Sequence, residues 1–160
     1  MPIRLCLAGL LALAACTAQA RDPDSAMVSM DTAGMTTEVR ARADGFAAAV
    51  LARNVDSVMS YVTSDVVLLE PGIDVKGREA FRALVDDLWK VYTVTSFTMT
   101  PESHTFGPDV VTEFGRYRET YKDSTNVEQT CDCVYSAIWR RDTDGVWRQS
   151  RIHAGQPLKP

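Results

Sequence analysis

The sequence predicts a single domain of the α+β class, with three helices first and an antiparallel sheet after them. Apolar residues recur at helical spacing up to about residue 90, and the rest of the chain is rich in β-branched and aromatic residues separated by turn-forming clusters. Each predicted helix has one apolar stripe to bury. A curved sheet that wraps over the helices would bury all of these stripes, and a pocket would form between the sheet and the helices.

The predicted helices are marked by apolar stripes and by residues that start or stop a helix. The first begins after Thr36 or Thr37, either of which serves as its N-cap, and it ends at Asn54. Glu79 and Lys90 lie at the two ends of the third helix, where the helix dipole favours their charges. The predicted helices span residues 37–53, 56–61 and 77–90.

Strands are predicted where β-branched and aromatic residues gather between turn signals. One short strand lies between the second and third helices and is closed by Pro71 and Gly72. The four strands after the third helix follow one another as hairpins. The predicted strands cover residues 65–70, 92–100, 110–122, 127–141 and 146–153.

The charge balance argues against nucleic acid as a partner. The chain has 160 residues, with 17 Lys and Arg against 21 Asp and Glu, and a formal net charge of −4. Such a chain has no excess of cations to neutralise phosphates. The sequence also has no nucleophile elbow, no H-E-x-x-H, no P-loop and no G-x-G-x-x-G motif, so the common hydrolase, metalloprotease and nucleotide-binding classes lack support.

The first residues resemble a secretory signal peptide. Arg4 precedes an apolar run over 5–15, which has the length of a signal-peptide core and is too short to cross a bilayer. Residues 13–16 (LAAC) resemble a bacterial lipobox, in which Cys16 is lipidated and becomes the mature N-terminus. The alternative is ordinary cleavage after Ala20, because residues 18–20 fit the A-x-A rule.

These signals divide the chain into a leader, a tether and one domain. We expect a signal peptide over 1–15, or 1–20 in the alternative, a flexible tether over 16–35 and a folded domain over 36–157. The domain is then exported to the periplasmic side of a bacterial membrane, with a lipid anchor as its only contact with the membrane. The alternative is a soluble periplasmic or secreted protein.

Short motifs in a fixed order carry a resemblance to a known family. They lie at residues 54–61, 65–72, 75–80, 109–111, 115–117, 138–141 and 144–147. Their order and spacing resemble the SnoaL-like and DUF4440 branch of the nuclear transport factor 2-like (NTF2-like) superfamily over about residues 37–155. The resemblance implies a cone-shaped, cystatin-like α+β fold, with three N-terminal helices packed against a curved antiparallel sheet and one open pocket. It also implies a homodimer, but no single chemistry.

One difference from the family pattern limits which functional residues can be assigned from the resemblance. The last strand reads Arg151, Ile152, His153 where the family usually has an aspartate, and no clear equivalent exists for the catalytic Asp of the steroid isomerases or for their Tyr and Asp oxyanion donors. The steroid isomerase mechanism is therefore not transferred to this chain.

Three residues are the catalytic candidates: His153, Glu113 and Tyr117. In the strand over 110–122 the even positions carry the arginines and suit solvent, so the odd positions, with Glu113 and Tyr117, face the pocket. Burial would raise the pKa of such a carboxyl toward the range of a general acid or base. His153 is an imidazole near the end of the last strand. The alternatives are that Glu113 pairs with an arginine at the rim and that His153 is an ordinary hydrogen-bonded residue, while His104 is expected to be exposed.

Aromatic residues are the ligand-binding candidates. Tyr135 and Trp139 alternate on one face of the strand over 127–141 and could stack on a flat ligand, as could Tyr61 and Trp89. Arg151 could hold an oxyanion. All of these aromatic residues could equally be ordinary residues of the hydrophobic core. If a single bulge reverses the last strand, its other face lines the cone instead.

Cys131 and Cys133 leave several possibilities open. Side chains two apart on a strand lie ~6 to 7 Å from each other, so a disulfide would need a local irregularity. Buried free thiols are favoured over a disulfide, and a metal site is disfavoured because there are few further ligands. We expect no metal and no cofactor.

The function favoured by the sequence is binding of a small apolar or aromatic molecule in the cone. The first alternative is a cofactor-independent enzyme of the same fold that catalyses proton transfer, as an isomerase or hydratase does. The second is a non-enzymatic dimerisation module with no working cavity. The sequence alone leaves open whether the protein is an enzyme.

Overall fold

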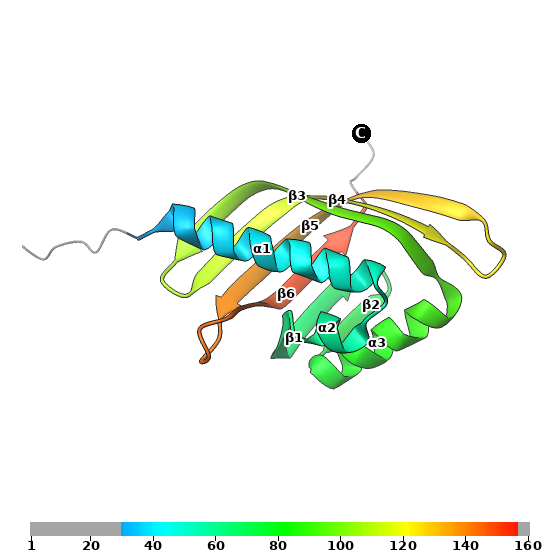
Figure 1. Cartoon of the computed structure of the whole chain (residues 1–160), viewed down its shortest axis with the longest axis horizontal. Helices are drawn as coiled ribbons and strands as arrows, with labels where there is room; N and C mark the ends of the chain where they lie inside the picture. The colour runs from blue at the N-terminus through cyan, green and yellow to red at the C-terminus, as the bar shows by residue number, and fades with distance from the viewer. Residues whose placement is uncertain (1–29, 157–160) are drawn as a thin grey trace, which may run out of the picture.

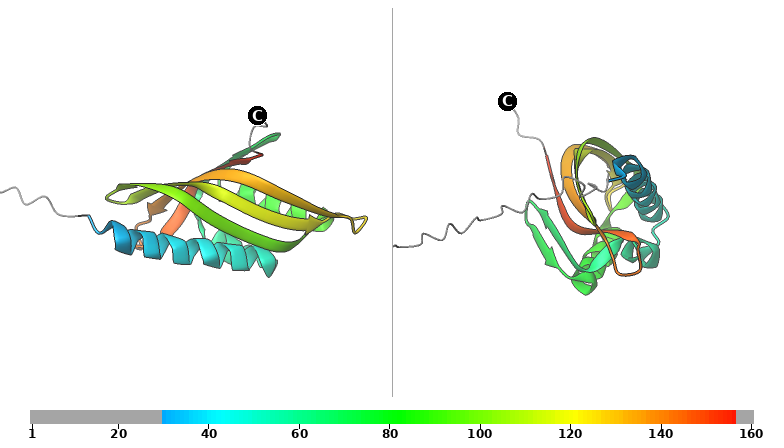
Figure 2. Two further views of the ribbon diagram at one scale, coloured as in Figure 1. Left: turned by 90° about the horizontal axis from the view of Figure 1, so that it is seen from above. Right: turned by 90° about the vertical axis from the view of Figure 1, so that its left-hand side faces the viewer.

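A curved six-stranded sheet with three helices on its concave side forms the part of the chain that the computed structural model describes, residues 30–156 (Figures 1 and 2). The helices are α1 (Thr32–Leu51), α2 (Val55–Met59) and α3 (Arg78–Val91). The strands are β1 (Val62–Glu70), β2 (Ile73–Lys76), β3 (Thr93–Gly107), β4 (Val110–Lys122), β5 (Glu128–Arg141) and β6 (Trp147–Gly155). The α+β class and the hairpin series from β3 to β6 are confirmed. No helix within 30–156 has the length and apolarity needed to span a membrane.

The sheet is mixed, which corrects the expectation of a purely antiparallel one. Its strand order is β2-β1-β6-β5-β4-β3, and β1 pairs with β6 in parallel. Helix α3 and the long hairpins lie between these two strands in the sequence, so the chain can return to β1 in the same direction. Strand β2 was not predicted. Gly72 has a φ of +83°, a conformation that suits glycine, and it turns the chain back into a short hairpin in which Leu69 pairs with Asp74.

Helix α1 begins five residues before the predicted start. Asp31, not Thr36 or Thr37, is the N-cap, and its side chain accepts a hydrogen bond from the Gly34 amide at 2.8 Å. Met35 extends the buried stripe by one turn, which explains the earlier start. Residues 32–35 of the expected tether are therefore helical, and the leader with Cys16 lies outside the described residues.

Other boundaries also depart from the sequence prediction, among them the start of β1, which is Val62 and not residue 65. Asn54 caps α2, where its side chain accepts from the Ser57 amide, and is not the end of α1. Strand β3 continues to Gly107 beyond the predicted end at residue 100, because the pairing with β4 absorbs Pro101 in a register shift. Since β3 is an edge strand, it tolerates the missing amide hydrogen of a proline.

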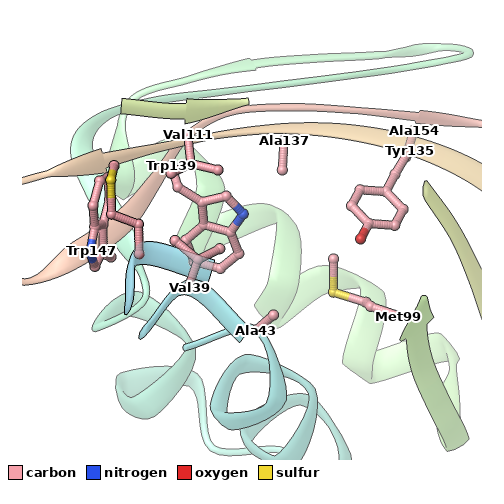
Figure 3. Close-up of a cluster of buried hydrophobic side chains, with 10 residues drawn as sticks. Val39, Ala43, Met99, Val111, Tyr135, Ala137, Trp139, Trp147 and Ala154 are labelled. Atoms are coloured by element: carbon pink, nitrogen blue, oxygen red, sulfur yellow. The ribbon is translucent and has the colours of Figure 1, made fainter. Parts of the chain in front are cut away.

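Two clusters of buried side chains form the core. One lies between α1 and strands β3–β6 and includes Val39, Ala43 and Trp139 (Figure 3). The other lies between α2, α3 and β1 and includes Val58 and Phe81. Phe46 packs against both clusters, and the space between them stays open as a cavity.

Candidate functional site: the cone cavity

The cavity lies between the helices and the concave face of the sheet and has a volume of about 370 Å³. All three helices and all six strands contribute to its walls, with Val58 from α2 and Ile73 from β2, and the walls are mostly apolar. Eight of the lining residues are aromatic: Phe46, Phe81, Trp89, Tyr92, Phe97, Tyr117, Tyr121 and Tyr135. A volume and lining of this kind are typical of small-molecule sites.

Two carboxyl groups stand in this apolar setting, Glu70 at the end of β1 and Glu119 on the inner face of β4. Burial raises the pKa of Glu119 from 4.5 to about 7, and the charge of Glu70 adds to the shift. Burial also raises the pKa of Glu70, while nearby His153 lowers it. Within residues 30–156 neither carboxyl group has a hydrogen-bond or ion-pair partner among the side chains. Glu119 can therefore gain or lose a proton near neutral pH.

Tyr117 lies two residues before Glu119 on the same face of β4 and lines the cavity as predicted. Burial raises the pKa of its phenol above the ordinary value, and the charges of Glu70 and Glu119 add to the effect. The phenol thus remains protonated at neutral pH and can donate a hydrogen bond. Its ring packs against Phe97, with 5.9 Å between the ring centroids.

Glu113 points inward as predicted but does not line the cavity. It is 1% exposed, and its Oε1 accepts a hydrogen bond from the Tyr135 hydroxyl at 2.7 Å. Its Oε2 lies 2.9 Å from Nε2 of His104, which faces it across the β3–β4 pair. The pairing with a rim arginine and the exposed position of His104 are therefore both wrong. Glu113 holds the Tyr135 side chain in place instead of meeting a ligand.

His153 and Arg151 lie on the outer face of the sheet, which is the alternative in which a single bulge reverses the last strand, and neither candidate faces the cone. The β5–β6 pairing shifts register between Ile138 and Trp139, which leaves Ser150 as an extra residue. Ile152 consequently lines the cavity, and His153 lies in a separate groove on the outer face. Arg151 donates a hydrogen bond to the Asp65 carbonyl oxygen at 3.1 Å.

Two of the four aromatic ligand-binding candidates line the cavity and two do not. Trp89 and Tyr135 line the cavity, whereas Tyr61 and Trp139 do not. Trp139 is fully buried in the cluster under α1 (Figure 3). Tyr61 packs edge-on against Phe46, at 6.3 Å between the centroids, and the guanidinium of Arg42 lies over its ring.

Cys131 and Cys133 are joined by a disulfide, which corrects the expectation of free thiols. Their Cα atoms lie 5.4 Å apart, closer than alternate residues of a regular strand and within the range that a disulfide spans. The pairing of β5 with β4 runs through both residues without a bulge. The described part of the chain contains no cluster of three or more potential metal ligands of the His, Cys, Asp or Glu type.

The sequence reasoning missed Glu70 and Glu119 as site residues. Glu119 shares the odd-numbered face of β4 with Tyr117, so the alternation that selected Tyr117 also indicated Glu119. Glu70 had a weaker signal, because it ends a strand directly before a turn. Its position in the cavity depends on how β1 pairs with β6, which no local pattern reveals.

Comparisons with known proteins agree on the fold. The family model of the SnoaL-like domain matches residues 43–149. A ketosteroid isomerase-like protein from Erwinia carotovora atroseptica superposes with a TM-score of 0.68 at 16% identity, over 78% of this chain and 96% of that one. An NTF2-like protein of unknown function from Pseudomonas putida superposes with a TM-score of 0.64 at 16% identity, over 80% of this chain and 90% of that one.

A third solved structure is that of a hexachlorocyclohexane dehydrochlorinase (LinA) of type 2. It superposes with a TM-score of 0.64 at 19% identity, over 76% of this chain and 84% of that one. No curated protein matches the sequence. Since the family model covers more than half of the chain, the protein belongs to the SnoaL-like domain family and has the NTF2-like fold.

Proposed function

We propose that the protein binds a small, largely apolar molecule in the cone cavity. The observation that carries the proposal is the cavity of about 370 Å³ with eight aromatic residues in its wall. Open volume of this size inside a small domain forfeits packing contacts, and a bound molecule would restore them. A dimerisation module without a ligand would gain nothing from keeping such a space open.

The binding test compares a variant that fills the cavity with one that adds the same side chain elsewhere. Val94 lines the cavity from β3, whereas Thr98 on the same strand is exposed. We expect 2-naphthylmethanol, measured by calorimetry, to bind the wild-type protein and Thr98→Trp but not Val94→Trp. Equal binding by folded Val94→Trp would place the molecule outside the cavity and refute the proposal.

The second candidate function is proton transfer without a cofactor, and the position of Glu119 favours it. Its pKa of about 7 suits a general base at neutral pH, and the protonated phenol of Tyr117 beside it could donate a hydrogen bond to a developing oxyanion. Structural neighbours of this chain include proteins named ketosteroid isomerase-like and dehydrochlorinase. In this proposal Glu119 replaces the earlier candidates His153 and Glu113, and Tyr117 is retained.

Proton transfer can be measured as uptake of deuterium from D₂O at the carbon next to the carbonyl of 2-tetralone. We expect the wild-type protein to accelerate the exchange and Glu119→Gln to lose the acceleration. Glu79→Gln is the matched control, because Glu79 is exposed in the first turn of α3. Exchange that is equally fast with Glu119→Gln would remove Glu119 as the base.

We further propose that the protein is exported and anchored through a lipid on Cys16, supported by the leader and by the LAAC sequence at 13–16. Fractionation of cells that make the full chain tests this. The wild-type protein should remain with membranes, and Cys16→Ser should not be lipidated. Unchanged mass and membrane association of Cys16→Ser would contradict a lipid anchor.

A further inference from the structure

The charges that line the cavity are all of one sign. Glu70 and Glu119 are the acidic residues of its wall, and no Lys, Arg or His from the described part of the chain lines it. The arginines of β4, Arg116 and Arg118, point to the opposite face of the sheet and are exposed. A ligand that enters the cavity therefore meets carboxyl groups and aromatic rings, and residues 30–156 offer it no cationic side chain in the wall.

Within residues 30–156 neither carboxyl group has a hydrogen-bond or ion-pair partner among the side chains. Glu113, which is fully buried, does have partners: it accepts a hydrogen bond from the Tyr135 hydroxyl and lies beside His104. Glu70 and Glu119 have no such partner within residues 30–156, although burial acts on both of them. An unpaired charge in an apolar setting is costly. A positively charged group on the ligand would relieve that cost.

Aromatic residues flank Glu119 in the wall of the cavity. Tyr117 and Tyr121 flank it on the same face of β4, and Phe97 lies directly opposite it on β3. Tyr92 packs edge-on against Tyr121, with 5.3 Å between the centroids. All four of these rings line the cavity. The faces of aromatic rings attract organic cations, and aromatic cages with a carboxylate bind alkylammonium groups.

We propose that the cavity selects an organic cation, an apolar molecule with an ammonium group that lies between Glu119 and Glu70 and against the rings of Tyr117, Tyr121 and Phe97. This inference rests on the proposed binding function and specifies the ligand class. The apolar part of the ligand would occupy the wall formed by α1 and α3, where Phe46 and Leu84 line the cavity.

The proposal predicts how binding depends on pH. The groups that face Glu119 are Glu70 from β1 and the phenols of Tyr117 and Tyr121 on its own strand, while His153 acts on Glu70. Because the pKa of Glu119 is about 7, the group is mostly protonated at pH 6 and mostly ionised at pH 8. A permanently charged ligand should therefore bind up to about tenfold more tightly at pH 8 than at pH 6.

The experiment uses three probes with one ring system and different charges. They are (2-naphthylmethyl)trimethylammonium, 2-naphthylmethanol and 2-naphthoate, each titrated into the protein by calorimetry at pH 6 and pH 8. At pH 8 we expect the cation to bind at least about tenfold more tightly than the alcohol, and the carboxylate to bind most weakly. The cation should lose this advantage in Glu119→Gln with Glu70→Gln, and keep it in Glu79→Gln.

The outcomes separate the two proposals. If the cation and the alcohol bind equally well at pH 8, the selection for a cation is overturned and the binding function stands. If the cation keeps its advantage in the variant that lacks both cavity carboxyl groups, the assignment to Glu70 and Glu119 is overturned. If none of the probes binds, the binding function itself is contradicted.

Discussion

Replacing Glu119 by Gln should stabilise the protein at high pH and leave it almost unchanged at low pH. The folded protein holds the pKa of Glu119 at about 7, against an ordinary value of 4.5. Between these values the folded state binds more protons than the unfolded state, so the free energy of unfolding falls as pH rises through this window. Glutamine keeps the size of the side chain and cannot ionise, so this loss should disappear.

The magnitude follows from the difference between the two pKa values of Glu119, about 7 and 4.5. At ~1.4 kcal/mol per pH unit, full ionisation costs about 3 kcal/mol. Solvent in the cavity screens the charge, so we expect about 2 kcal/mol of difference between pH 5 and pH 8. Glu70 contributes a loss in the same direction, because its pKa is also raised, and this loss remains in the variant.

The assay is urea unfolding of the wild-type protein and Glu119→Gln at pH 5 and pH 8, with Glu79→Gln as the control for removal of one exposed charge. Wild-type protein and Glu119→Gln should have nearly equal free energies of unfolding at pH 5, and the variant should be more stable at pH 8. A wild-type protein that is as stable as the variant at pH 8 would refute a buried, proton-sensitive Glu119.

Three further predictions concern residues outside the cavity. Glu113→Gln should lower the free energy of unfolding by about 1 to 3 kcal/mol, because it removes a buried carboxylate that accepts a hydrogen bond from Tyr135. Urea unfolding measures this, and a loss under about 0.5 kcal/mol would contradict that role. Trp139→Phe should leave the affinity of a cavity probe within about twofold, since Trp139 does not line the cavity; a large loss would return it to the site. We also predict a homodimer that buries Phe114, which is 52% exposed on the outer face of the sheet. Light scattering should show a dimer that Phe114→Asp converts to a monomer, and a wild-type monomer would rule this interface out.

Local patterns predicted most of the elements and the inward faces of β4 and β5. The alternation along β4 placed Glu113 and Tyr117 inward, and the structure confirms both directions. The hairpin series from β3 to β6 followed from turn residues, which act over a few positions. These features depend on residues that are close in the sequence, so they can be predicted from the sequence alone.

The errors arose where distant pairing decides the outcome. The extra residue at Ser150 reverses β6, which moves His153 outward and brings Ile152 into the cavity. Pairing of β1 with β6 makes the sheet mixed and sets Glu70 near Glu119. No local pattern signals either event, because both depend on which strands meet and in which register.

The central claim is that the cone cavity holds a small molecule, and native mass spectrometry tests it most directly. The wild-type protein and Val94→Trp would be exposed to the same extract of small metabolites and compared. We predict that the wild-type protein retains a specific added mass that is absent from Val94→Trp, in which the cavity is filled. The same added mass on both proteins, or none on the wild-type protein, would contradict a ligand-binding cavity.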